Sequence, residues 1–114
     1  MKTLHTNYKL APGDVRLTVL VGNGHRGNTL VAVGSDVLVN QPDIRNVRIG
    51  SADDLRGKTL SVITTVSQVN TATADAIVTY QARGGAENRD FQLDDDFADG
   101  EVQLQFVATF DFTE

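Results

Sequence analysis

Cysteine and tryptophan are absent from this chain of 114 residues. Without cysteine there is neither a disulfide nor a thiolate ligand for a metal ion. Sugar-binding sandwiches usually stack rings on exposed aromatic side chains. This chain has no tryptophan, and its two tyrosines, Tyr8 and Tyr80, alternate in step with apolar neighbours. The composition therefore argues against a stacked sugar site, although a polar groove can still hold a sugar.

Long apolar runs are also missing. Residues 1–6 lead into no apolar run of the length that a signal peptide needs. No stretch approaches the ~20 apolar residues of a membrane-spanning helix, so we predict no membrane span. If Met1 is the native start, we expect the protein in the cytoplasm; if a signal peptide has been removed, we expect it to be secreted or periplasmic.

Charge is spread unevenly along the chain, whose net charge is −5. Residues 1–57 carry seven Lys or Arg against five Asp or Glu, whereas residues 58–114 carry three against ten. Clustered acidic residues repel phosphate backbones, which argues against nucleic-acid binding.

What the chain does have is apolar alternation. Between Glu101 and Phe112 every second residue is apolar, which is typical of a β-strand with one buried face. Similar segments, separated by turn residues, recur at a spacing of about 8–14 residues, the pattern of a sandwich or barrel. We predict one domain, residues 1–114, folded as an all-β antiparallel β-sandwich of immunoglobulin-like or jelly-roll type. It should have about eight strands, with the last strand inside a sheet, and at most one helical turn, beginning at Ser51.

The segment Gly22-Asn23-Gly24-His25-Arg26-Gly27 matches the G-x-G-x-x-G pattern of dinucleotide sites. That mechanism needs a helix after the third glycine, but β-branched residues and Gly34 follow it here. We therefore interpret the segment as a hairpin loop without a nucleotide and expect its histidine to be solvated. No nucleophile stands at a recognisable catalytic spacing from this histidine. We keep His25 and Arg26 as candidate interaction residues and predict no catalytic residue.

An acidic run, which we interpret as a loop between two strands, begins at Asp94. Calcium prefers several carboxylate oxygens on a flexible loop. The candidate metal ligands are Asp94, Asp95, Asp96 and Asp99. The run does not match an EF-hand, because Phe97 falls at a ligand position. The alternative to a metal site is a solvated loop that favours solubility.

The final strand is long for a small sandwich, at roughly 40 Å with ~3.4 Å per residue. It either bends and serves both sheets, or its far end projects beyond the core. In the second case Phe110 and Phe112 would be exposed, and a homodimer through this strand would bury them. In the alternative monomer, loops such as 70–75 cover the end of the strand.

No catalytic constellation and no cofactor fingerprint is recognisable in the chain. We therefore predict a non-enzymatic binding module that recognises another protein through its surface and needs no cofactor. The alternative is a calcium-dependent carbohydrate- or lipid-binding sandwich that uses the acidic residues 94–101.

Overall fold

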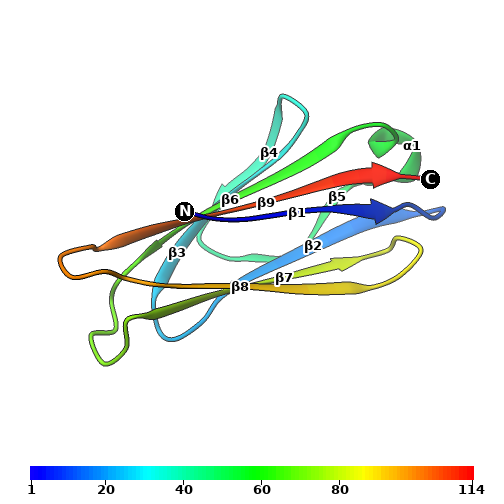
Figure 1. Cartoon of the computed structure of the whole chain (residues 1–114). Helices are drawn as coiled ribbons and strands as arrows, with labels where there is room; N and C mark the ends of the chain where they lie inside the picture. The colour runs from blue at the N-terminus through cyan, green and yellow to red at the C-terminus, as the bar shows by residue number, and fades with distance from the viewer.

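Nine strands and one short helix make up the fold, and the computed structural model describes all 114 residues. The elements are β1 (Lys2–Lys9), β2 (Asp14–Val21), β3 (Arg26–Val33), β4 (Asp36–Gln41), β5 (Ile44–Ser51), α1 (Ala52–Leu55), β6 (Thr59–Ser67), β7 (Asp75–Arg83), β8 (Arg89–Asp96) and β9 (Gln103–Thr113). One sheet has the order β1-β9-β6-β3-β4, and the other has the order β5-β2-β7-β8. The sheets lie face to face (Figure 1), which confirms the predicted β-sandwich.

The core lies between the two sheets and is built by alternation. In β6, β7 and β9 every second residue is buried, as a strand with one inward face requires. Aromatic side chains from the two sheets meet at its centre, where the rings of Tyr80 and Phe110 are 6.5 Å apart in an edge-to-face arrangement. Burying each large apolar side chain contributes about 1.5–3 kcal/mol, so these three strands supply much of the stability.

Both ends of β9 differ from the prediction. Phe110 and Phe112 are buried in this chain's own core, so the interpretation of them as an exposed dimerisation surface is wrong. The strand lies between β1 and β6, and therefore has no free edge with which to pair a second copy. Val102, the first residue of the apolar alternation, precedes the strand and is 67% exposed.

The sequence predicts a wholly antiparallel sandwich, and this prediction is wrong for one pair of strands. β1 runs parallel to β9, in a register that pairs Lys2 with Phe106 and Lys9 with Thr113. Parallel neighbours cannot be joined by a tight turn, and here almost the whole chain lies between the two strands. The pairing therefore closes the fold by bringing the first strand beside the last.

The glycine-rich segment is not the hairpin loop that we predicted. β2 lies in the four-stranded sheet and β3 in the five-stranded sheet, so residues 22–25 cross from one sheet to the other. β3 begins at Arg26, before the third glycine, and no helix follows. The predicted absence of a helix after this segment is confirmed.

The single helical turn is confirmed at α1. Ser51 Oγ accepts a hydrogen bond from the Asp54 amide at 3.2 Å, and Asp54 Oδ2 accepts one from the Ser51 amide at 3.3 Å. This reciprocal capping box satisfies donors that a helix start leaves unpaired. Gly57, with φ of +74°, ends the turn. The structure contains no helix that is long and apolar enough to cross a membrane.

Candidate functional site

Three connections meet at one end of the sandwich, at the left in Figure 1. They are residues 22–25 between β2 and β3, residues 68–74 between β6 and β7, and residues 97–102 between β8 and β9. We call this set the loop end. Because strands hold both ends of each loop, the loop end combines irregular backbone with a rigid base, which suits a recognition surface.

His25 lies at the centre of the loop end and is not solvated, contrary to our prediction. Only 8% of the residue is exposed. The Val69 amide donates to Nδ1 at 3.4 Å, so the ring proton is on Nε2, which donates to the Asp75 carbonyl at 3.1 Å. The ring also packs edge-to-face on Phe97, with centroids 5.0 Å apart. One side chain thus contacts all the elements that meet at the loop end.

Asparagine side chains add further links between the loops. Asn70 Nδ2 donates to the Asn23 carbonyl at 3.0 Å, and Asn23 Nδ2 donates to the Asp75 carbonyl at 2.9 Å. Asn23 has φ of 61° and Gly24 has φ of 73°, a left-handed conformation that Asn and Gly adopt more easily than other residues. The sequence Asn23-Gly24 signals this turn, but only the folded chain shows what it contacts.

Two apolar side chains stand exposed on this framework. Val69 is 56% exposed and Val102 is 67% exposed. Their loops are joined by a hydrogen bond from the Gln68 amide to the Val102 carbonyl, at 2.9 Å. Sequence reasoning missed Val69, because a single valine in a polar loop carries no signal. It also assigned Val102 to the core, since the valine continues the alternation of β9.

A hollow of about 330 Å³ opens beside Val69. It is lined by His25 from the β2–β3 connection, by the exposed Arg26 at the start of β3, and by Pro42 and Asp43 from the β4–β5 connection. The structure therefore brings the two predicted interaction residues together with Val69. Arg26 and the exposed Asp43 both present a charge there, whereas both ring nitrogens of His25 are already bonded.

The acidic residues are placed differently from our prediction. Asp94, Asp95 and Asp96 lie on β8, paired with β7, and only Asp99 lies in a loop. On a strand, successive side chains point to opposite faces, so Asp95 points away from its two neighbours. No group of three or more His, Asp or Glu side chains is close enough to hold a metal ion. Calcium binding by these residues stays a prediction.

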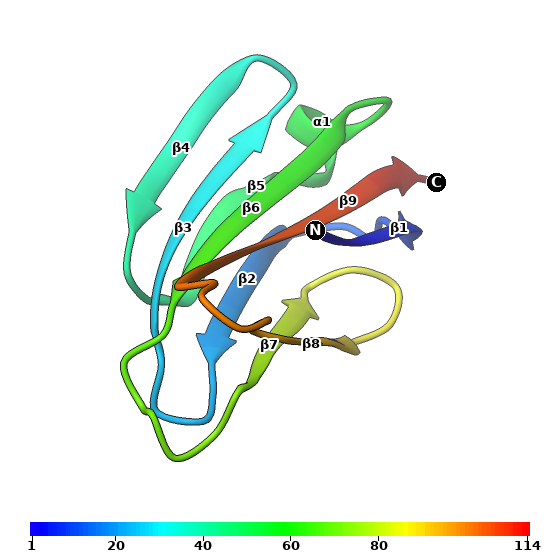
Figure 2. The same ribbon diagram turned by 60° about the vertical axis from the view of Figure 1, so that its left-hand side comes forward.

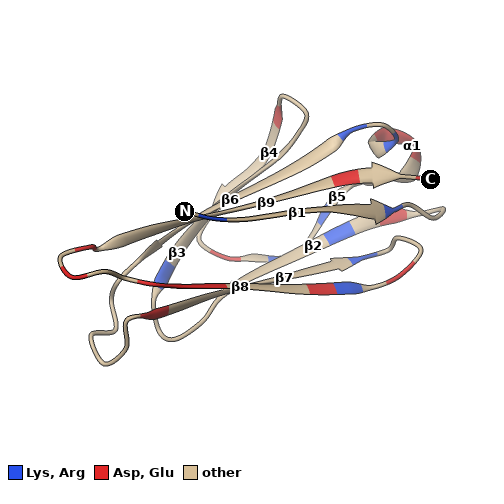
Figure 3. Cartoon of the chain, in the orientation of Figure 1, with Lys and Arg blue, Asp and Glu red and all other residues tan.

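These acidic residues also carry unpaired charge. None of Asp94, Asp95, Asp96, Asp99 and Glu101 takes part in an ion pair, whereas the ion pairs of the chain lie elsewhere. Figure 3 shows acidic segments gathered on β8 and on the loop that follows it. Lys2 lines the shallow hollow beside Asp75 and residues 94–96 and is the one cation there.

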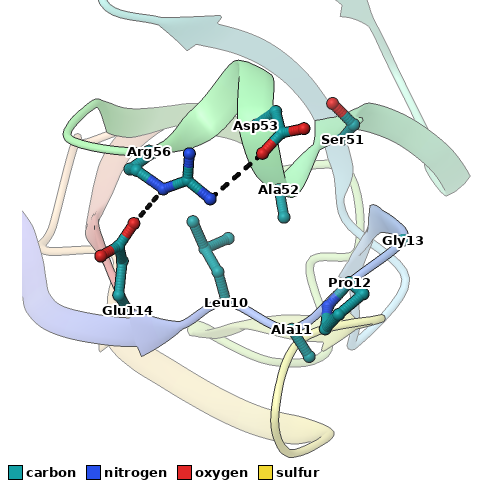
Figure 4. Close-up of a pocket in the computed structure, with 9 residues that line it drawn as sticks. All are labelled: Leu10, Ala11, Pro12, Gly13, Ser51, Ala52, Asp53, Arg56 and Glu114. Atoms are coloured by element: carbon teal, nitrogen blue, oxygen red, sulfur yellow. Dashed lines mark ion pairs between the residues drawn. The ribbon is translucent and has the colours of Figure 1, made fainter.

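A cleft of about 330 Å³ at the opposite end has no comparable free groups. Figure 4 shows its lining, in which Arg56 forms ion pairs with Asp53, at 3.1 Å, and with Glu114. Ser51, also in the lining, is engaged as the helix cap. The polar side chains of this cleft are therefore already engaged, and no histidine lies in its lining to activate the serine.

His5 and Asp111 form a further pair, on the outer face of β1 and β9. The imidazole Nε2 and Asp111 Oδ2 are 2.6 Å apart, and the Thr59 hydroxyl donates to Asp111 Oδ1 at 2.7 Å. Both hydrogen bonds lower the pKa of the Asp111 carboxyl, and the one from Thr59 has the larger effect. His5 is exposed, as the strand parity predicts, and the carboxylate that faces it is engaged by Thr59.

No protein-family model matches this chain, and neither a curated protein nor a solved structure is found to be similar to it.

Proposed function

We propose that this chain is a non-enzymatic binding module that recognises another protein through the loop end. The observation that carries the proposal is the pair of exposed valines, Val69 and Val102, on adjacent loops joined by the Gln68–Val102 hydrogen bond. Apolar side chains at the centre of a surface patch, surrounded by polar groups, are the usual anatomy of a protein interface.

Preorganisation of the loops supports this role. Ordering flexible loops on binding costs affinity, and loops that are already held in place avoid that cost. His25 bonds to backbone groups of Val69 and Asp75, and the Phe97 amide donates to the Ala74 carbonyl at 2.8 Å. The two valines therefore stand on a framework with little conformational entropy left to lose.

Charge indicates the chemistry of the partner. Residues 94–96 at the end of β8, and Asp99 and Glu101 in the following loop, form no ion pairs and lie beside the loop end. A basic surface would be attracted to them, and such attraction raises the rate of association more than the final affinity. We infer a partner with an apolar spot bordered by Lys or Arg.

The environment of His25 favours binding over catalysis. A general base needs a free ring nitrogen near a nucleophile. Both nitrogens of His25 are bonded to backbone groups, so neither is free to take up a proton from a substrate. This arrangement supports the proposal of a non-enzymatic module.

Affinity capture from the native host tests the proposal. The tagged wild type is compared with the double variant Val69→Ser, Val102→Ser, which removes the exposed apolar area without touching the core. Ala86→Ser is the matched control, because Ala86 is exposed in the connection between β7 and β8, at the opposite end of the sandwich.

We expect a partner that the wild type and the control capture and the double variant loses. Because acidic residues attract the partner, its rate of association should also fall as salt rises. Equal capture by all three proteins, or no specific partner for the wild type, would contradict the proposal.

A further inference from the structure

The edge strand β4 is exposed on both faces and at its outer edge. It pairs only with β3, and five of its six residues are exposed. None of the backbone hydrogen bonds outside the regular ladders involves residues 36–41. Figure 2 shows the β3–β4 hairpin at the outer margin of its sheet, so the outward N–H and C=O groups of β4 have only water as partner.

The side chains of β4 do little to protect this edge. Val37 is 59% exposed and Leu38 is 39% exposed, in the run Val37-Leu38-Val39. Natural sheets protect such edges with lysine, proline, inward charges or bulges. The only charged residue of β4 is Asp36, at its start, and the only device present is a bulge at Leu38, which has no partner on β3.

The other three edge strands carry stronger protection. β1 begins and ends with lysine, so pairing it antiparallel with its own copy in full register sets Lys2 against Lys9. β5 is interrupted by register shifts and by Asn46, whose φ is 50°. If β8 pairs antiparallel with its own copy in full register, Asp90 lies opposite Asp95 of the other copy. Like charges directly opposite each other destabilise a strand pair.

We propose that β4 pairs with β4 of a second copy of this chain, antiparallel, across a two-fold axis at Leu38. This register sets Val37 against Val39 and Asp36 against Asn40 of the other copy. Asn40 Oδ1 already accepts a hydrogen bond from Asn28 Nδ2, at 2.6 Å. The side-chain N–H groups of Asn40 are therefore free to donate to the carboxylate of Asp36 on the other copy. No two like charges face each other in this register.

The resulting dimer cannot add further copies through β4, because an isologous contact uses the same strand on both copies. It joins two five-stranded sheets into one continuous sheet and leaves the loop end of each copy free. The bulge at Leu38 shortens the regular ladder, so the association should be weak and should depend on concentration. The inference is independent of the proposed function, which uses a different surface.

Charge exchange at Leu38 tests this axis, since a residue on the axis faces itself. Leu38→Lys and Leu38→Glu should each abolish the dimer by placing like charges opposite each other. An equimolar mixture of the two variants should restore association as a heterodimer. Sedimentation equilibrium of the wild type should show a mass that rises with concentration from 12.3 kDa towards twice that value. Melting temperatures control for folding.

A single cysteine provides a second measurement, because the chain has none of its own. Leu38→Cys should form a disulfide-linked dimer under mild oxidation, and Val102→Cys should not, although Val102 is the more exposed of the two residues. A wild type that stays monomeric into the high-micromolar range overturns the proposal. So does growth beyond two copies, a Leu38→Lys variant that dimerises like the wild type, or a variant mixture that stays monomeric.

Discussion

Tyr8 occupies the space that a side chain at position 85 would need. A Cβ atom on Gly85 would lie 2.5 Å from Tyr8 Cε2 and 2.6 Å from the Lys9 carbonyl oxygen. The Tyr8 hydroxyl also accepts a hydrogen bond from the Gly85 amide and donates one to the Glu87 carbonyl, each at 2.9 Å. Through this contact the first strand is fixed to the connection between β7 and β8.

We therefore expect Gly85→Ala to destabilise the fold by about 1–3 kcal/mol, the usual cost of overpacking. Gly22→Ala is the matched control, since a Cβ there would make only ordinary contacts, at 3.7 Å from Ile77. Urea unfolding of both variants measures the difference. Equal stability of the two variants would show that Tyr8 adjusts without cost.

His25→Phe keeps a ring against Phe97 but removes both nitrogen atoms. The Val69 amide loses its partner, whereas the Asp75 carbonyl keeps the hydrogen bond from Asn23 Nδ2. Leaving a buried polar group unpaired costs about 1–3 kcal/mol. We expect a lower free energy of unfolding and faster hydrogen exchange at the Val69 amide. His5→Phe, at an exposed position, should change stability much less. If both variants behave alike, His25 does not organise the loop end.

Acid should weaken the fold partly through Asp111. The Thr59 hydroxyl and then the His5 imidazole lower the pKa of this carboxyl below its ordinary 3.8. A carboxyl with a lowered pKa in the folded state stabilises the protein above its unfolded pKa, and loses that contribution as pH falls through the folded pKa.

The stability difference between wild type and Asp111→Asn should thus be present above pH 3.8 and shrink below it. Urea unfolding measured at a series of pH values gives this difference directly. A difference that stays constant across the series would mean that the Asp111 charge is not what stabilises β9.

Calcium binding by the acidic residues has a thermodynamic test. Binding to the folded state alone would raise stability by RT ln(1 + [Ca²⁺]/Kd), about 2.7 kcal/mol at a hundredfold excess over Kd. If residues 94–99 bind calcium, the melting temperature rises with calcium, and Asp95→Asn with Asp96→Asn abolishes the rise. An unchanged melting curve at millimolar calcium contradicts the alternative function.

Local pattern was sufficient for the class of fold and for the direction of most core side chains. Alternation in residues 104–112 placed the phenylalanines on one face, and the structure buries all of them. Tyr8 and Tyr80 followed the same parity and are buried, and the spacing of Ser51 and Asp54 marked the helical turn. These features depend on neighbours within a few residues, which a single chain displays directly.

Pairing between distant segments determined the rest. The three consecutive aspartates at residues 94–96 predict a loop. In the structure they belong to β8, because their backbone pairs with β7 and these hydrogen bonds outweigh the low strand preference of Asp. His25 is buried because loops from β6–β7 and β8–β9 close over it. The parallel contact of β1 with β9 and the free edge of β4 likewise follow from which strands meet. Alternation specifies the face of a strand that is buried and leaves its neighbours unspecified, so the candidate interaction surfaces emerged only with the assembled sheets.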